Sequence, residues 1–153
     1  NLVSITSKTI TVALANTSQQ LVVKNIEKHT GDDIYRAFNK LFAKKKVNLS
    51  KFTPLEINHI ESGTVANGMR KEAVIIAIGY PPITETFSQV SNQWVYWTSR
   101  FNRFKVNFEN GKVNGKVDSE KRPMFPLVVL LLQYENQFYL EQTVLYNLIL
   151  LLY

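Results

Sequence analysis

The four residues at 53–56, Thr-Pro-Leu-Glu, constrain the fold of this chain more than any other feature, because they set the start of a helix. Thr53 is a preferred N-cap residue, and the proline after it fits the first helical position. Glu56 completes a capping box with Thr53. Gly63 is placed to take the left-handed conformation that closes a helix. We therefore expect a short helix up to Gly63, with apolar positions at Leu55, Ile57 and Ile60.

A second helix is predicted from near Met69, and the sequence also fixes where it stops. The helix should stop at Gly79 and the pair Pro81-Pro82. Proline ends a helix because it lacks the backbone N–H and clashes with the preceding turn. Helical spacing places one apolar stripe toward the core. Its members are Ala73, Val74, Ala77 and Ile78.

Alternation with a period of two predicts strands after a polar loop at 84–91. The segment 93–98 has Trp94 and Tyr96 on one face, with Val95 and Trp97 on the other. The next strand has Phe104, Val106 and Phe108 on one face and Arg103, Lys105 and Asn107 on the other. Asn110-Gly111 is a strong two-residue hairpin turn that returns the chain through Lys112 and Val113.

The first 51 residues predict a β-hairpin followed by a helix. Residues 8–14 alternate as a half-buried strand, 16–18 supply turn residues, and 20–26 resume an extended β-branched run. A helix is expected to open at 30–33, where Thr30 acts as a cap, and to end near Lys45. Its apolar stripe is Ile34, Phe38, Leu41 and Phe42.

The last segment, 119–153, holds two apolar runs, 127–132 and 144–152. Neither reaches the roughly 20 residues that a membrane span needs. Three interpretations stay open: a pair of core elements, a contact with a membrane surface or a partner, and a tail that is not native to the domain. In each case something must cover so apolar a segment.

The amino-acid composition limits the kinds of site and partner that the chain can have. The chain has no cysteine, which excludes disulfides, thiolate metal sites and cysteine nucleophiles. It begins at Asn1 without an apolar run behind a basic start, so we expect no signal peptide and no lipobox in it. The formal net charge is +6, which fits a solvated surface or a polyanionic partner. The positive residues include Lys24, Lys28, Lys44, Lys45, Lys46, Arg70, Lys71, Arg100, Arg103, Lys105, Lys121 and Arg122.

The order of these features resembles the SmpA/OmlA (BamE-like) family of small bacterial outer-membrane lipoproteins, over roughly residues 52–118. The order is a capped short helix, Gly-Met, a helix ending in Gly-Tyr-Pro-Pro, Asn-x-Trp-x-Tyr-Trp, and a strand ending Asn-Gly-Lys-Val. Arg70 departs from the family, in which Ser or Thr is common at that position. The residues that carry the likeness are Ile60, Gly63, Gly68, Met69, Glu72, Ala73, Val74, Ile78, Gly79, Pro81, Trp94, Tyr96, Val106, Phe108, Gly111 and Val113.

The resemblance implies an α+β fold in which two helices pack on a three-stranded antiparallel sheet. It also implies an envelope location, in the periplasm and associated with the outer membrane, and a scaffolding role without chemistry. We expect three segments in one globular unit: an N-terminal extension (1–51), the α+β module (52–118) and the apolar tail (119–153).

Catalytic and metal-binding motifs are absent from the sequence. The two histidines, His29 and His59, lie 30 positions apart beside ordinary helix or turn residues, and surface or capping roles fit them better than a metal site. Asp32 and Asp33 fit helix capping better than a cation site. We expect a protein that is not an enzyme and has no cofactor and no small-molecule substrate.

One cluster of residues is a candidate binding site, because aromatic residues interleaved with arginines anchor many interfaces or stack on bases. Its members are Trp94, Tyr96, Trp97, Arg100, Phe101 and Arg103, with Phe104 beside them. The competing interpretation is a strand core with a charged edge. The leading hypothesis is an interaction module for an envelope protein, with possible membrane-surface contact. The alternative is a basic domain that binds nucleic acid or an anionic surface.

Overall fold

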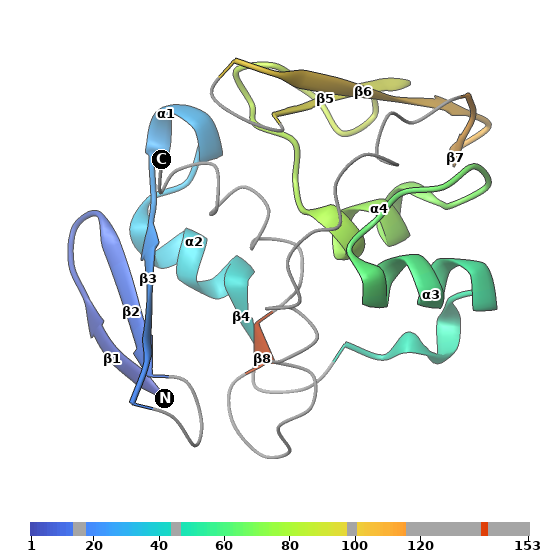
Figure 1. Cartoon of the computed structure of the whole chain (residues 1–153). Helices are drawn as coiled ribbons and strands as arrows, with labels where there is room; N and C mark the ends of the chain where they lie inside the picture. Colours follow the sequence, from blue (N-terminus) through green and yellow to red (C-terminus); the bar gives the residue numbers. More distant parts are fainter. Residues whose placement is uncertain (14–17, 44–46, 98–100, 116–138, 141–153) are drawn as a thin grey trace.

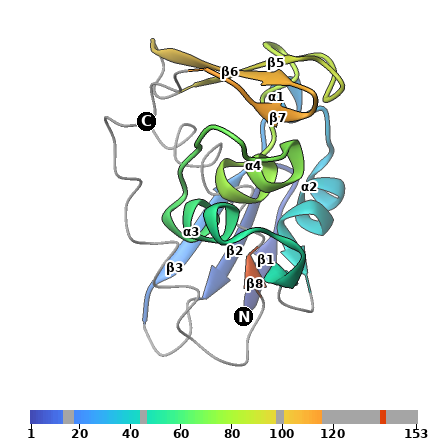
Figure 2. The ribbon, with the colours of Figure 1, turned by 90° about the vertical axis from the view of Figure 1, so that its right-hand side faces the viewer.

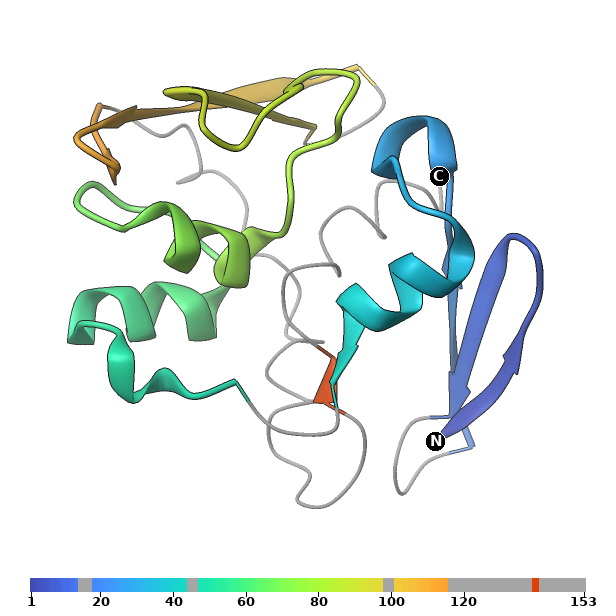
Figure 3. The same ribbon diagram turned by 180° about the vertical axis from the view of Figure 1, so that it is seen from behind.

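The computed structural model of the chain describes residues 1–13, 18–43, 47–97, 101–115 and 139–140, which form two halves side by side (Figure 1). The view from behind shows the same division (Figure 3). Each half has its own three-stranded antiparallel sheet and its own buried cluster of apolar side chains. The class is therefore α+β, as expected, but with two such sheets where the sequence predicted one sheet and a hairpin.

The N-terminal half contains strands β1 (Leu2–Ile5), β2 (Thr9–Ala13) and β3 (Gln20–Lys24), in that order across the sheet. The short helix α1 (Glu27–Thr30) and helix α2 (Ile34–Leu41) follow. The predicted pair of strands is confirmed as β2 and β3, whereas β1 and α1 were not foreseen. The expected turn at 16–18 lies largely outside the described residues. The core of this half consists of Ile10, Val12, Val23, Ile34, Ala37, Leu41 and Phe42.

Helix α2 differs from its prediction at both ends. Asp33, not Thr30, is its N-cap, and its carboxylate accepts from the backbone N–H groups of Tyr35 and Arg36, both at 2.9 Å. The helix ends at Leu41 and does not reach Lys45, because Phe42 becomes extended. Phe42–Ala43 forms strand β4, which pairs with β8 (Tyr139–Leu140). The other residues of the C-terminal tail lie outside the described residues.

The C-terminal half contains the 3-10 turn η1 (Leu49–Lys51), helices α3 (Pro54–Ser62) and α4 (Lys71–Ile78), and strands β5 (Gln93–Trp97), β6 (Arg103–Glu109) and β7 (Lys112–Val113). Both helices and the three strands confirm the predicted elements. Thr53 forms the capping box with Glu56, and Gly63 closes α3 at φ 64°. Figures 1 and 2 show α4 between the sheet and α3.

Packing of α4 on the sheet forms the larger core. The four predicted inward positions of α4 are all buried, and they belong to one cluster with Phe104, Val106 and Phe108 of β6. Trp94 meets Phe108 edge to face at 4.6 Å between ring centroids. The hydroxyl of Tyr96 donates to the carbonyl of Gly79 at 2.9 Å, which fixes the end of α4 over β5. The predicted face assignment of both strands is confirmed.

One of the three apolar positions of α3 faces solvent. Leu55 is 45% exposed, and the neighbouring Glu56 is buried in its place. The reason lies outside α3: Arg70, just before α4, donates to the Glu56 carboxylate through its backbone N–H and Nε, both at 2.9 Å, and through Nη2 at 2.8 Å. The backbone N–H of Thr53 donates at 2.9 Å as well. Glu56 is therefore both the capping-box acid and the link between the two helices.

This arrangement holds the pKa of Glu56 at about 2, chiefly because the Arg70 side chain donates to the carboxylate, while burial opposes the shift. A folded-state pKa below the unfolded value stabilises the fold above the unfolded pKa, and that stability is lost as the pH falls through the folded pKa.

We predict that acid removes a stability contribution from Glu56 between about pH 4.5 and 2, on the order of 3 kcal/mol. Urea unfolding of the wild type and of Glu56→Gln across this range measures it. The difference in unfolding free energy should be largest near pH 6 and shrink toward pH 2. Glu61→Gln, an exposed change on the same helix, is the control. A Glu56→Gln protein as stable as the wild type at pH 6 would contradict the prediction.

Candidate functional site

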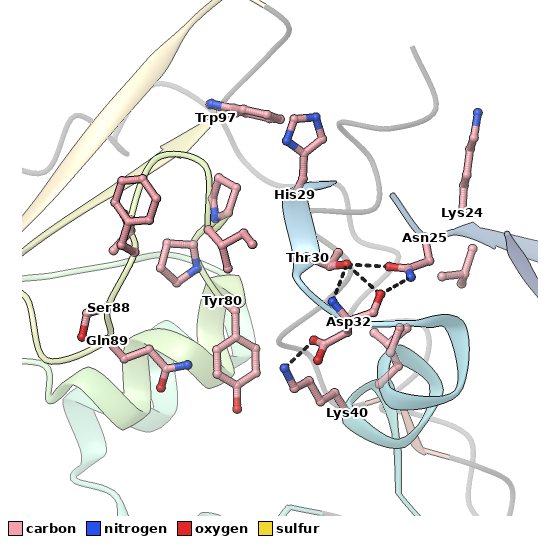
Figure 4. Close-up of a pocket in the computed structure, with 18 of the residues that line it drawn as sticks. Lys24, Asn25, His29, Thr30, Asp32, Lys40, Tyr80, Ser88, Gln89 and Trp97 are labelled. Atoms are coloured by element: carbon pink, nitrogen blue, oxygen red, sulfur yellow. Dashed lines mark hydrogen bonds and ion pairs between the residues drawn. The ribbon is translucent and has the colours of Figure 1, made fainter. Parts of the chain in front are cut away.

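A cleft of about 560 Å³ lies where the two halves meet, and both halves line it (Figure 4). One wall is formed by the end of β3, by α1 and by α2. The other is formed by the connection 79–92 between α4 and β5, together with Trp97. The N-terminal half contributes Val23, Lys24, Asn25, His29, Thr30, Asp32, Ala37, Lys40 and Leu41, and the C-terminal half contributes Tyr80, Pro81, Pro82, Ile83, Thr86, Phe87, Ser88, Gln89, Val90 and Trp97.

A polar network stiffens the N-terminal wall. The Thr30 hydroxyl donates to Asn25 Oδ1 at 2.9 Å, and Asn25 Nδ2 donates to the backbone carbonyl of Asp32 at 2.6 Å. Lys40 forms an ion pair with the Asp32 carboxylate, and its ammonium also lies 5.4 Å from the centroid of the Tyr80 ring across the cleft. Most polar groups of this wall are thus already bonded to one another (Figure 4).

The opposite wall is apolar and partly open to solvent. Pro81 and Pro82 are buried, whereas Phe87 and Val90 are 92% and 84% exposed. Thr86 ties this wall to the sheet, because its Oγ1 accepts from the backbone N–H of Val95 at 2.9 Å. Two large apolar side chains exposed at the edge of a cleft are a feature of binding surfaces.

Lys71, at the start of α4, anchors the connection 79–92. Its ammonium donates to the backbone carbonyls of Gln89, Val90 and Ser91 at 3.1, 3.0 and 2.8 Å. The same group lies 5.1 Å from the centroid of the Phe108 ring. One side chain therefore holds the segment that carries Val90.

His29 joins the two walls. Its backbone carbonyl accepts from the N–H of Ile83 at 2.9 Å, its Nδ1 lies 3.2 Å from the hydroxyl of Thr84, and its ring meets Trp97 edge to face at 4.7 Å. Burial lowers the pKa of His29, and Lys28 lowers it further, while Glu85 opposes the shift. His29 therefore serves as a contact between the two halves.

Gly31 allows the close approach at this junction. Its φ is +72°, and a Cβ atom there would lie 3.0 Å from Cδ1 of Ile83. A larger residue would therefore meet a side chain of the other half and an unfavourable backbone angle together.

The structure separates the six predicted interface residues. Trp94 and Tyr96 are fully buried core residues, so their side chains are inaccessible to a partner, and this part of the prediction is corrected. The regular alternation along β5 places them there, toward α4. Trp97, on the other face, lines the cleft. Phe101 is 82% exposed and is not among the residues that line the cleft. Arg100 lies outside the described residues.

Arg103 is engaged within the protein. Its Nε donates to the Glu85 carboxylate at 2.8 Å, and the indole N–H of Trp97 donates to the same carboxylate at 2.9 Å. The hydrogen bond from Arg103 lowers the pKa of Glu85 most, followed by that from Trp97. Glu85 therefore fastens the connection 79–92 to β5 and β6.

Sequence reasoning missed the apolar wall of the cleft. Phe87 and Val90 stand in a segment that the sequence predicts as a polar loop, and the signal for them was the presence of two large apolar residues in such a loop. Nothing in the sequence pointed to the role of Lys71.

The titratable residues do not converge on a metal site in the described part of the chain. His59 lies on α3, in the other half from His29, with its Nδ1 2.7 Å from the hydroxyl of Thr64. Asp33 caps α2, and Asp32 pairs with Lys40. Over the same described residues, no helix has the length and apolar character to cross a membrane.

Comparisons with protein-family models, with curated proteins and with solved structures find nothing that matches this chain. The resemblance to the SmpA/OmlA family therefore stays a prediction.

We predict that Lys71→Met loosens the connection 79–92, because methionine keeps the apolar stem and loses the ammonium that binds three carbonyls. Hydrogen exchange of the amides at 86–91 should become roughly tenfold faster, and stability should fall by about 1–2 kcal/mol. Lys105→Met is the matched control, since that ammonium has no bonding partner within the described residues. Equal exchange rates in both variants would refute the anchoring role.

Proposed function

We propose that this protein is a non-enzymatic module of the bacterial cell envelope that binds a protein partner in the cleft between its two halves. The envelope part of the proposal rests on the likeness of residues 52–118 to the SmpA/OmlA family. The binding part rests on the geometry of the cleft.

The observation that carries the proposal is the exposed pair Phe87 and Val90 on the wall made by the connection 79–92. Tyr80, Pro81 and Trp97 line the cleft as well, and their rigid side chains lose little conformational entropy when a partner orders them. Aromatic side chains in a partly enclosed site account for much of the binding energy of protein interfaces.

The fixed geometry of this wall also supports binding. Lys71 and Glu85 tie the connection to α4 and to the sheet, and His29 ties it to the N-terminal half. A partner would meet a preformed surface, so less binding energy is spent on ordering it.

The described cations give the alternative partner, a polyanion, only limited support: Lys24, Lys28 and Lys105 form no ion pair with a described carboxylate, but most of the arginines and several of the lysines are already bonded within the protein. Ion pairs with carboxylates already engage Arg36, Lys40, Lys51, Arg70 and Arg103. The ammonium of Lys71 is bonded to carbonyls. A surface that neutralises phosphates needs cations free to do so.

Site-specific photo-crosslinking in cells that make the protein tests the proposal. A photoreactive phenylalanine analogue at position 87 should give a discrete crosslinked species with an envelope protein. The same analogue at position 101 is the matched control, because Phe101 is almost equally exposed and lies outside the cleft lining. Phe87→Ser should weaken capture of that partner at least about fivefold, and Phe101→Ser should not. Crosslinks only from position 101, or none from either, would rule out the cleft.

A further inference from the structure

Strand β3 has a free side. It stands at the edge of the sheet in the order β1-β2-β3, with β2 on one side and no described strand on the other. The backbone N–H of Asn25 donates to the carbonyl of Lys8 at 2.8 Å, so residue 25 directs its main-chain groups toward β2. The register pairs Val23 with Ile10 in the same alternation.

In an antiparallel pair, the main-chain groups of every second residue point to the partner strand, and those between point away. Val22 and Lys24 therefore direct their N–H and C=O groups to the free side. In the described part of the chain no group bonds to them. Such a row of donors and acceptors, spaced for a strand, is a template for another strand.

The free side of β3 reaches the cleft at the carboxyl end of the strand, where Lys24 lies. Val23, Lys24 and Asn25 are among the lining residues, and Figure 4 shows Lys24 and Asn25 on the β3 side, across from Tyr80 and the connection 79–92. A chain that enters the cleft beside Lys24 and continues along β3 past Val22 would have main-chain partners on one side. On the other side, the apolar wall with Pro82, Phe87 and Val90 would receive side chains.

We propose that the occupant of the cleft is an extended segment of another protein, which adds to the N-terminal sheet as a fourth strand beside β3. This names the partner class of the cleft and so rests on the proposed function. The segment carries apolar residues at alternate positions, because successive side chains of a strand point to opposite faces. It also carries an acidic residue for the Lys24 end.

Charge selects this occupant over a second copy of the chain. Lys24 and Lys28 are exposed, and neither forms an ion pair with a described carboxylate. A lysine on an edge strand discourages pairing with an identical edge, and two copies would each bring a formal charge of +6. A segment with a carboxylate meets Lys24 favourably.

The test uses the full chain and peptides selected against it from a displayed library of random 12-residue sequences. Peptide affinity is measured by fluorescence anisotropy, and amide exchange by NMR with and without peptide. Binding should slow exchange of the Val22 and Lys24 amides at least about tenfold. Val22→Pro removes one outward N–H without removing a bond to β2, and should weaken binding about tenfold. Val22→Thr keeps the N–H and the branched shape, and should stay within about twofold.

The outcomes separate the two proposals. In one outcome, peptide binding requires Phe87, is unchanged by Val22→Pro, and does not slow exchange of the Val22 and Lys24 amides. This result overturns strand addition and keeps the cleft as the binding site. Protection of both amides with no dependence on Phe87 supports strand addition and removes the apolar wall from the proposed function. Selection of no peptide counts against both. A dimer in sedimentation velocity with both amides protected in the absence of peptide assigns the edge to a second copy and overturns the proposal. If Val22→Pro fails to fold, the exchange measurement on the wild type decides.

Discussion

Burial of α4 beneath the β5–β6–β7 sheet is the interaction on which the other features of the C-terminal half depend. All four inward residues of the helix are buried against Trp94, Tyr96 and Val106. Once the helix is seated, Gly79 ends it beneath Tyr96, and the chain must travel from there to the start of β5. The connection 79–92 runs along the junction with the N-terminal half, and it therefore forms one wall of the cleft.

The ion pair between Glu56 and Arg70 has a different character from this apolar packing. A carboxylate buried to 1% exposure is unfavourable by itself, because burial removes its hydration, and only its many donors offset that cost. Arg70 takes the N-cap position of α4, but its side chain does not cap that helix. Its side chain instead serves the neighbouring helix, so the pair fixes how α3 and α4 sit relative to each other.

The two walls of the cleft offer different interactions: one offers hydrogen bonds and the other apolar area. On the N-terminal side, Asn25, Thr30, Asp32 and Lys40 bond to one another. The unused hydrogen-bonding groups of this side are then those of the β3 edge, which has no partner strand among the described residues. On the other side, Phe87 and Val90 supply apolar area that water covers in the free protein. A partner that used both walls would gain directional bonds from one and hydrophobic burial from the other.

The sequence by itself determined most of the local structure, since caps, proline stops, alternation and the Asn110-Gly111 turn are set by neighbours in the chain. It located α3, α4 and the β5–β6–β7 hairpins, and it assigned the inward faces of α4, β5 and β6 correctly. Only the tertiary structure decided that Glu56 and not Leu55 is buried, that α2 ends at Leu41, and that Trp97 alone of the aromatic residues of β5 lines the cleft. These outcomes depend on contacts between residues far apart in the chain, such as Arg70 with Glu56 and His29 with Ile83, and no local periodicity encodes which distant group a side chain will meet.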